Sequence, residues 1–297
     1  IGYISITKDP EDIKKLTRWE SWWTSSKVNH FLGKDNIPFH TVFWPAILMA
    51  GKSYKKFTLP YTVAGYEYLN WENQKFSTSR GIGLFSDTAL KSFPVDYWRF
   101  YLSSILPEKK DSNFEWEDFQ NRINSELIAN YGNLFYRVTS FIEKNFGYVP
   151  KPVKAKQQEL ELLKKLKQTV KEVEILVRDL KLRDALKEIM SLSAETNRYF
   201  QNKEPWFAIR SKTTRSDAAT SLYYSANALR IVSTMLHPYI PRSSERALVA
   251  LNAKGKMRWS NIKDFVLRPG HRISLEILFK KIEDEDIENA KKFGQSF

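Results

Sequence analysis

The chain has 297 residues, 42% of them hydrophobic, and 47 Lys and Arg against 34 Asp and Glu give it a formal net charge of +13. A chain of this length can form a sizeable hydrophobic core, and the length suggests about two domains. It has no cysteine, which excludes disulfides and thiolate zinc sites, and no apolar run approaches the roughly 18 residues of a membrane span. The basic charge suits a polyanionic partner such as nucleic acid, although a soluble basic protein without such a partner would also carry it.

The first part of the chain, to about residue 110, predicts mixed α and β structure. Val28–Leu32 is a short apolar strand that runs into the turn-forming residues Gly33–Asn36. Phe39–Ala50 predicts a buried helix with aromatic residues on one face. A strand-like run, Tyr61–Leu69, follows, and the polar turn Asn70–Gln74 ends it. The sequence starts at Ile1, without an initiator Met and inside strand-like sequence, so we expect a piece of a longer protein.

Residues 75–81, with the sequence KFSTSRG, are the most informative segment. Its cationic and hydroxyl side chains are hydrogen-bond donors that suit an anionic ligand. Taken alone, this composition more often marks an ordinary solvated loop. Its interpretation therefore depends on the rest of the chain.

Beyond a polar break at Pro107–Ser112, which we take as a domain boundary, the pattern becomes helical. Apolar residues at spacings of three, four and seven predict one long amphipathic helix that ends near Asn145. These residues are Trp116, Phe119, Ile123, Leu127 and Leu134. Gly147–Pro150 ends the helix.

A heptad-like stripe follows, and because it lasts under three heptads it predicts a bundle helix rather than a coiled coil. Its residues are Leu163, Leu166, Val170, Val173, Val177 and Leu180. Further helices are predicted over Leu182–Phe200 and Asp217–Met235, and Pro238 and Pro241 are expected to close the bundle. An irregular stretch and a charged helix from about Glu283 complete the chain.

Many blocks of the sequence stand in the order and spacing found in methionyl-tRNA synthetases of the archaeal or eukaryotic cytosolic type. The blocks are IGY at 1–3, FLGKDN at 31–36, FHTVFWPA at 39–46, KFSTSRG at 75–81, DYWRFYL at 96–102, Asn133-Leu134 with Arg137, NRY at 197–199, EPW at 204–206, LHPYIP at 236–241 and GHRI at 270–273. Residues 75–81 resemble the KMSKS signature loop of class I aminoacyl-tRNA synthetases. Since ordered blocks are far more specific than a single motif, the chain resembles the second half of this family.

The resemblance implies a partial α/β Rossmann catalytic domain followed by an all-α helix bundle that binds the anticodon. The expected domains are residues 1–110, with the signature loop, residues 111–250, the helical anticodon-binding domain, and residues 251–297, a C-terminal extension with a terminal helix. The family's HIGH-like ATP motif and its zinc-bearing insertion have no counterpart here. We therefore expect that the chain does not catalyse the complete reaction without the missing N-terminal half.

The reaction implied by the resemblance has two steps. The methionine carboxylate attacks the α-phosphate of ATP, giving methionyl-adenylate and pyrophosphate, and the aminoacyl group then passes to tRNA(Met). The attacking carboxylate is already ionised, so catalysis needs positioning and electrostatic stabilisation rather than a strong protein base. ATP, with Mg²⁺, is the expected cofactor-like substrate, and no metal or zinc site is expected in this part.

The resemblance places the phosphate chemistry in the signature loop and in the turn after the first strand. The expected catalytic residues are Lys75, Ser77, Thr78 and Ser79. The expected ATP-binding residues are Gly33, Asp35, Thr78 and Arg80. Asp35 suits the ribose hydroxyls, although GKDN alone is an ordinary turn. Thr78 stands where many family members have a second lysine, so Lys75 and Arg80 are expected to carry more of the electrostatic load.

The expected methionine-binding residues match the family's amino-acid pocket. They are Tyr3, Phe39, His40 and Trp44. Aromatic rings suit a polarisable thioether, and a helix would put His40 and Trp44 on one face because they are four residues apart. Without the surrounding blocks, core aromatic residues and a hydrogen-bonded core histidine are the commoner meaning of this pattern.

The expected anticodon-binding residues are Asn133, Arg137 and Trp206. Asn133 and Arg137 lie four apart on the long helix, and an amide and a guanidinium can read base edges. Pro205 suits the first turn of a helix, which leaves Trp206 near a helix start where it can stack on an unpaired base. A helix-surface polar residue or a core tryptophan is the alternative in each case.

Two function classes follow from these residues. The first is the distal part of a cytoplasmic methionine–tRNA ligase, whose partners are tRNA(Met), methionine, ATP and the missing half, without a membrane. The alternative is a non-catalytic tRNA-binding module, which has no use for the pocket residues or the signature loop. Another class I synthetase with a helical anticodon domain is disfavoured by the blocks at 39–44 and 204–206.

Overall fold

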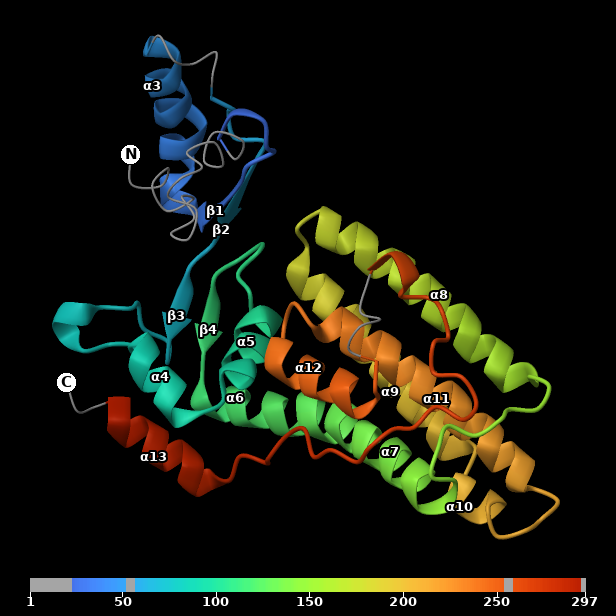
Figure 1. The fold of residues 1–297 in the computed structure, drawn as a ribbon. Helices are drawn as coiled ribbons and strands as arrows, with labels where there is room; N and C mark the ends of the chain where they lie inside the picture. The colour runs from blue at the N-terminus through green and yellow to red at the C-terminus, as the bar shows by residue number, and fades with distance from the viewer. Residues whose placement is uncertain (1–22, 52–56, 254–258, 295–297) are drawn as a thin grey trace, which may run out of the picture. The chain divides into compact units, whose positions relative to one another are not determined.

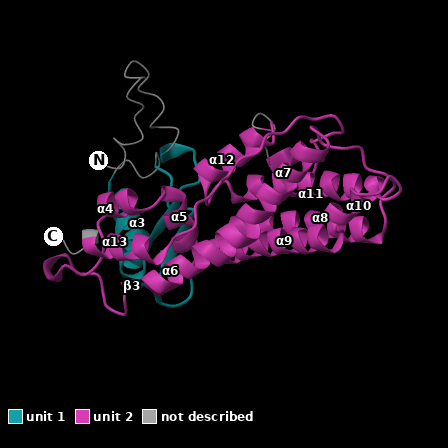
Figure 2. Cartoon of the chain, turned by 90° about the horizontal axis from the view of Figure 1, so that it is seen from below, with its two compact units in different colours: residues 1–69, 107–112 teal, residues 70–106, 113–297 magenta. Residues whose placement is uncertain are grey.

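The computed structural model describes residues 23–51, 57–253 and 259–294 of the chain. Short strands and helices come first and long helices follow (Figure 1), in the order that the sequence predicts. The chain divides into two compact units (Figure 2), a first unit of residues 1–69 with 107–112 and a second unit of residues 70–106 with 113–297. The domain boundaries expected at residues 110 and 250 stay predictions.

The first unit is built on two parallel strands, β1 (Asn29–Gly33) and β2 (Thr62–Tyr66), which pair residue by residue along their length. Parallel neighbours need a crossover connection. Here the crossover contains the single turn η2 (Lys34–Asn36), the π turn η3 (Phe39–Phe43) and α3 (Trp44–Ala50). Two of the expected ATP-binding residues therefore lie at the carboxyl end of β1, Gly33 as its last residue and Asp35 in the turn that follows.

The prediction that Phe39–Ala50 is a buried helix is half wrong. The segment is helical, and Leu48 is buried, but Phe39, Phe43 and Ile47 are exposed by 56%, 54% and 64%. An apolar stripe of helical period does not say whether another element covers it. The described elements of the first unit leave this stripe largely uncovered.

A second two-stranded sheet consists of β3 (Leu69–Trp71) and β4 (Ser112–Phe114). All residues of these strands except Leu69 and Ser112 belong to the second unit. Between these strands in sequence come the signature loop, α4 (Ser86–Ser92) and α5 (Val95–Ser104). The strand-like run predicted over 61–69 is thus split, with β2 ending at Tyr66 and β3 starting at Leu69.

An aromatic cluster holds this part of the second unit together. Trp71 and Phe114 stack with ring centroids 4.1 Å apart and planes 2° apart. Trp98 lies 4.8 Å from Phe119, and its indole N–H donates to the carbonyl of Ala89 at 2.7 Å. Aromatic pairs of this kind add to the free energy gained from burial alone. Trp71 stands four residues before Lys75, and its ring lies 5.8 Å from that of Phe76, so the cluster anchors one end of the signature loop.

The long helix predicted to end near Asn145 is confirmed, with one difference. It runs through α6 (Trp116–Arg122), the π-helical segment η5 (Ile123–Gly132) and α7 (Asn133–Asn145) without a break. Gly147, at φ +70°, follows its end as the sequence predicts. The π winding was not foreseen, because apolar spacing does not separate π from α hydrogen bonding.

The bundle contains α8 (Gln157–Arg178), α9 (Leu182–Asn202), the short α10 (Pro205–Ala208) and α11 (Arg215–Leu236). α9 packs on both α8 and α11, and α11 is buried along most of its length. The helices predicted over 182–200 and 217–235 are confirmed, and each observed end differs from its prediction by at most two residues.

The stripe predicted on α8 is partly wrong. Leu166, Val170 and Val173 are buried as predicted, but Val177 is 39% exposed, and Leu162 rather than the predicted Leu163 is buried. The cause is that a straight α-helix drifts by about 20° per heptad relative to a 3.5-residue repeat. A heptad seam extended along α8 therefore moves off the buried face.

The C-terminal part also corrects one prediction. Pro241 starts a further helix, α12 (Pro241–Ala250), instead of closing the bundle, because proline is well tolerated in a first helical turn. A single turn, η7 (Trp259–Asn261), and an irregular stretch follow, and the terminal helix predicted from about Glu283 is α13 (Asp284–Gly294). Within the described ranges, no helix is both long and apolar enough to cross a bilayer.

Candidate functional site

The signature loop of the second unit is closed by a backbone pair. The N–H of Ser77 donates to the carbonyl of Ile82 at 3.0 Å, and the N–H of Ile82 donates back at 2.8 Å. Between them Thr78–Arg80 form one 3₁₀ turn, η4, and Gly81 follows at φ +63°, a conformation that favours glycine. The loop thus holds consecutive polar side chains on one short turn.

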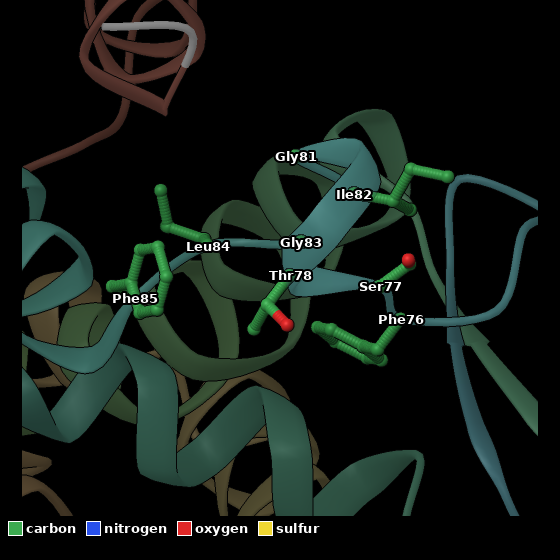
Figure 3. A pocket seen from close by; sticks show the side chains of 8 residues that line it. All are labelled: Phe76, Ser77, Thr78, Gly81, Ile82, Gly83, Leu84 and Phe85. Atoms are coloured by element: carbon green, nitrogen blue, oxygen red, sulfur yellow. The ribbon is translucent and has the colours of Figure 1, made fainter. Parts of the chain in front are cut away.

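A cavity of about 410 Å³ opens beside this loop (Figure 3), lined by residues 76–78 and 81–85. The Thr78 hydroxyl lies at this cavity together with the rings of Phe76 and Phe85. Gly83, at φ +124°, lies against Phe76, and a Cβ there would come within 2.5 Å of the ring. The side chains of Lys75 and Arg80 are exposed, so the loop can present cations and hydroxyls to an anionic ligand.

In the first unit, Gly33 ends β1 and Asp35 lies in the turn that follows. Among the residues that the structure describes, no atom lies within 4 Å of a Cβ built on Gly33, so they leave the backbone there open to close approach. One carboxylate oxygen of Asp35 accepts a short hydrogen bond from the Tyr68 hydroxyl. This hydrogen bond, and then burial, raise the pKa of Tyr68. The hydrogen bond from Tyr68 therefore orients the Asp35 carboxylate.

The described methionine candidates each contact another aromatic residue. The rings of Phe39 and Phe43 lie 5.5 Å apart, and the indole of Trp44 lies 6.3 Å from Trp23. The His40 ring lies 5.3 Å from His30.

The Nδ1 of His40 is 2.9 Å from the carbonyl of Asn36. Burial, and then the neighbouring His40, lower the pKa of His30. No ring pair joins His40 to Trp44 among the described residues, and Tyr3 lies outside them. The hydrogen bond that orients His40 therefore comes from the preceding turn, η2, and not from another methionine candidate.

The candidates for ATP and methionine do not fall in one unit. Gly33, Asp35, His40 and Trp44 belong to the first unit, whereas residues 75–81 belong to the second. Their convergence on one cleft stays a prediction.

Arg137 and Trp206 are brought together in the second unit. The guanidinium carbon of Arg137 lies 5.4 Å from the centre of the Trp206 ring, which is within reach of a cation–π interaction. Its Nη2 donates to Gln201 Oε1 at 2.9 Å and its Nη1 to Asn197 Oδ1 at 3.3 Å. Burial lowers the pKa of Arg137, but an arginine stays charged at neutral pH. The two amides from α9 thus fix the guanidinium beside the indole.

Trp206 lies at the start of α10, as the sequence predicts. Pro205 occupies the first turn, and Glu204 precedes it in a left-handed conformation at φ +41°. The indole lies 6.0 Å from the ring of Phe200 in an edge-on contact and is half-buried. It is neither a core tryptophan nor a fully exposed one, so one side of it remains accessible.

Asn133, the first residue of α7, is exposed and lies one turn before Arg137. Sequence reasoning missed the residues that hold Arg137 in place, Asn197, Gln201 and Phe200. A signal was present, because Asn197 and Gln201 are four apart on α9 and so share one face. The sequence does not indicate that this face of α9 packs against α7.

A buried ion pair lies at the end of α9, just before Trp206. Glu159 of α8 is fully buried and contacts Lys203 Nζ at 2.6 Å. It also accepts hydrogen bonds from the Tyr199 hydroxyl and the Lys156 backbone N–H, both at 2.8 Å. Burial acts to raise the pKa of Glu159, but these three donors outweigh it and the pKa lies below the ordinary value of 4.5. The carboxylate therefore joins α8 to the last turn of α9.

Over the described ranges, no group of three or more His, Cys, Asp or Glu side chains is arranged to hold a metal ion. The chemistry of the site therefore has to be argued from its cations, hydroxyls, amides and rings.

Two family models match the chain. Residues 1–139 match that of class I tRNA synthetases (M), and residues 149–296 match that of the anticodon binding domain of methionyl tRNA ligase. The methionine–tRNA ligases of Thermococcus onnurineus and Pyrococcus abyssi are each 39% identical to the chain over 97% of its length. The chain covers 40% and 41% of these two proteins, so it spans less than half of their length.

A solved structure shares the fold. The crystal structure of Mycobacterium tuberculosis methionyl-tRNA synthetase bound by methionyl-adenylate has a TM-score of 0.82 and 25% identity, and the match covers 94% of this chain and 54% of that one. The predicted fold class, a partial α/β catalytic domain followed by helices, is therefore confirmed.

Proposed function

This chain belongs to the methionyl-tRNA synthetase family, and we propose that it supplies the distal part of the catalytic domain and the anticodon-binding domain of a methionine–tRNA ligase. The observation that carries the proposal is the pairing of Arg137 with Trp206. This pairing presents a fixed cation and a half-exposed indole side by side.

Asn133, Arg137 and Trp206 bind the CAU anticodon of tRNA(Met) in this proposal. Sequence-specific RNA recognition mostly uses unpaired bases, which stack on aromatic rings and expose their edges to amides and guanidinium groups. The Trp206 ring stacks on one base, and Arg137, oriented by Asn197 and Gln201, donates to a base edge or a phosphate. Because the guanidinium is already held in place, little side-chain entropy is lost when RNA binds.

The signature loop stabilises the triphosphate of ATP during adenylation. As the methionine carboxylate attacks the α-phosphorus, negative charge accumulates on the departing pyrophosphate. The cations of Lys75 and Arg80 and the hydroxyls of Ser77, Thr78 and Ser79 offset that charge. The 3₁₀ turn and the left-handed Gly81 support this role, because they set consecutive donors on one short turn.

The first unit binds the remaining parts of the two small substrates. Asp35 accepts from the ribose hydroxyls of ATP, and Gly33 lets the nucleotide approach the backbone. Tyr3, Phe39, His40 and Trp44 surround the methionine side chain, whose thioether interacts favourably with aromatic rings. These assignments rest on the family's sequence pattern.

Complete aminoacylation, in this proposal, needs the part of the family's chain that is not matched here. The chain spans about two fifths of its archaeal relatives, and the reaction takes place in the cytoplasm with methionine, ATP and tRNA(Met). Mg²⁺ enters with ATP, and we assign it no ligand among the described residues. The alternative is a tRNA-binding module without chemistry.

Replacing the indole tests the anticodon role. Trp206→Ala should lower the affinity for an RNA stem-loop with a CAU anticodon at least about tenfold, because a stacked base loses its platform. Trp206→Phe should keep most of the affinity. Trp259, which is 40% exposed on η7, provides a matched control, and Trp259→Ala should bind like the wild type.

The measurement is a fluorescence anisotropy titration of the full chain, with circular dichroism to verify the fold. Unchanged binding by a folded Trp206→Ala variant would refute the anticodon role. Equal losses for RNAs with CAU and unrelated anticodons would refute specific recognition.

A further inference from the structure

The first turn of α5 (Val95–Ser104) caps the start of a bundle helix. Asp96 is 2% exposed, and its Oδ2 accepts a hydrogen bond from the backbone N–H of Ser243 at 2.6 Å. Ser243 lies in the first turn of α12, whose N-cap residue, Ile240, makes no side-chain cap. The free N–H groups at the start of a helix need an acceptor. Asp96 therefore caps α12 from a different helix.

Arg99 holds the turn that joins α11 to α12. Its Nη2 donates to the carbonyl of Pro238 at 2.6 Å, and its Nε donates to the carbonyl of Tyr239 at 3.1 Å. Both carbonyls lie in the short turn between the two helices. Asp96 and Arg99 are three residues apart and therefore share one face of α5. Through this face α5 is fixed to the end of α11 and the start of α12.

Another face of α5 is connected to the signature loop by packed aromatic rings. Trp98 is two residues from Asp96, and residues two apart do not share a helix face. The Trp98 ring lies 5.8 Å from that of Phe114, which stacks on Trp71. The Trp71 ring in turn lies 5.8 Å from that of Phe76, the second residue of the signature loop. A continuous series of rings thus joins α5 to the loop.

A second connection to the loop runs through α4. The indole N–H of Trp98 donates to the carbonyl of Ala89 in α4 at 2.7 Å. This helix begins at Ser86, shortly after Gly81, so its position limits where the carboxyl end of the loop can lie. The loop, α4, α5 and the ends of α11 and α12 all belong to the second unit.

We propose that α5 sets the position of the signature loop from the ends of α11 and α12, and that Asp96 and Arg99 are positioning residues for adenylation. Both side chains act through Trp98, because they hold the helix whose indole supports the loop and α4. Donors that stabilise a departing pyrophosphate are most effective when they are held in place before the reaction. This inference rests on the proposed function, since it assigns support to a loop whose role in adenylation is itself proposed.

Hydrogen–deuterium exchange of the full chain tests this positioning. The amides of Ser77 and Ile82, which bond to each other's carbonyls at the base of the loop, report on it. Asp96→Ala should speed their exchange about fivefold, the change expected when a helix cap is lost and α5 loosens. Arg99→Ala should also speed their exchange. Asp96→Asn should exchange like the wild type, because its amide oxygen can still accept from Ser243.

Asn227→Ala is the control for a general loss of stability. Asn227 is buried in α11, and its amide bonds to the carbonyl and the N–H of Leu267 at 3.0 and 3.1 Å. Its removal leaves these buried groups unpaired and destabilises the bundle, but the lost hydrogen bonds lie outside α5. The amides of Ser77 and Ile82 should therefore exchange in this variant as they do in the wild type.

Two results would overturn the inference. One is unchanged exchange at Ser77 and Ile82 in Asp96→Ala and Arg99→Ala variants whose circular dichroism shows that they are folded. The other is an equal acceleration in Asn227→Ala, since the exchange of the loop would then follow the stability of the bundle alone.

ATP–pyrophosphate exchange separates the inference from the proposed function. When the chain is mixed with a separately produced N-terminal half, Asp96→Ala should lower the rate about fivefold and Asp96→Asn should not. If Lys75→Ala lowers this rate while the Asp96 and Arg99 variants change neither the rate nor the loop, only the inference fails. If Lys75→Ala leaves the rate unchanged, the role of the loop in adenylation fails and the inference fails with it.

Discussion

Thr78 shows how one residue alters the expected chemistry of a loop. Its side chain replaces an ammonium with a hydroxyl, which keeps a hydrogen-bond donor but removes a point charge. It lies on a single turn with Ser79 and Arg80, and its hydroxyl reaches the cavity next to the loop. In the proposed mechanism, the remaining cations of the loop, Lys75 and Arg80, supply most of the electrostatic stabilisation.

Single substitutions in the signature loop test the catalytic proposal. When the chain is mixed with a separately produced N-terminal half, Lys75→Ala should reduce ATP–pyrophosphate exchange by about 10²-fold or more, as expected for a lost charge-stabilising donor. Thr78→Lys should change the exchange rate without changing the thermal unfolding midpoint. Exchange that is unaffected by Lys75→Ala would remove the loop from the mechanism. Intact CAU binding without any exchange would favour the non-catalytic module.

The contact between the start of α8 and the end of α9 shows how elements position Trp206, the proposed stacking residue. Glu159 holds Lys203 and Tyr199, and the chain then turns through the left-handed Glu204 into α10 with Trp206. Burial, and then the hydrogen bond to Glu159, raise the pKa of Tyr199, so the phenol stays a proton donor to the carboxylate. Removing one partner of such a buried pair leaves the other charge uncompensated.

We predict that Glu159→Gln destabilises the bundle by about 3–5 kcal/mol, the range for breaking a buried ion pair. The pKa of Glu159 is depressed below 4.5. Its stabilising effect is therefore complete above pH 4.5 and is lost as the pH falls through the lower folded-state value. Urea unfolding of the wild type and the variant from pH 7 to pH 3 should show their difference shrinking below pH 4.5. A difference that is independent of pH would contradict the ionic role, and Glu161→Gln, on the exposed side of α8, is the control.

The charge of the whole molecule has a separate effect on RNA binding. A net charge of +13 attracts a polyanion, and neutralising phosphates releases counterions, so the affinity depends on salt. Much of the excess of Lys and Arg falls between Lys151 and Lys187, on or beside α8, where Lys164, Lys167 and Lys171 are exposed. In the proposed RNA complex, these side chains supply attraction that carries no sequence information.

The affinity for the CAU stem-loop should therefore fall at least about tenfold between 50 and 200 mM NaCl. The ratio of wild-type to Trp206→Ala affinity should stay nearly constant over this range, because stacking releases few ions. Fluorescence anisotropy titrations at four salt concentrations measure both the affinity and the ratio of wild-type to Trp206→Ala affinity. An affinity independent of salt would contradict the electrostatic contribution, and a ratio that collapses with salt would contradict stacking.

Much of the fold could be predicted from local sequence. The limits of α9, α11 and α13 follow from a 3.6-residue period and from residues that start or stop helices. The predictions failed where the answer depends on a distant partner. Three predictions failed for this reason: the burial of Phe39–Ala50, the position of the buried stripe on α8, and the role of Pro241, which starts a helix.

The sequence by itself determined the family, the order of the elements and the chemical types available in the signature loop, since these depend on residue identity and spacing along the chain. Only the tertiary structure decided which side chains meet. Arg137 lies against amides of α9 some sixty residues away, and Phe279 packs on Gly132. Such contacts depend on how helices pack, and packing is set by the fit of whole surfaces, which no local pattern encodes.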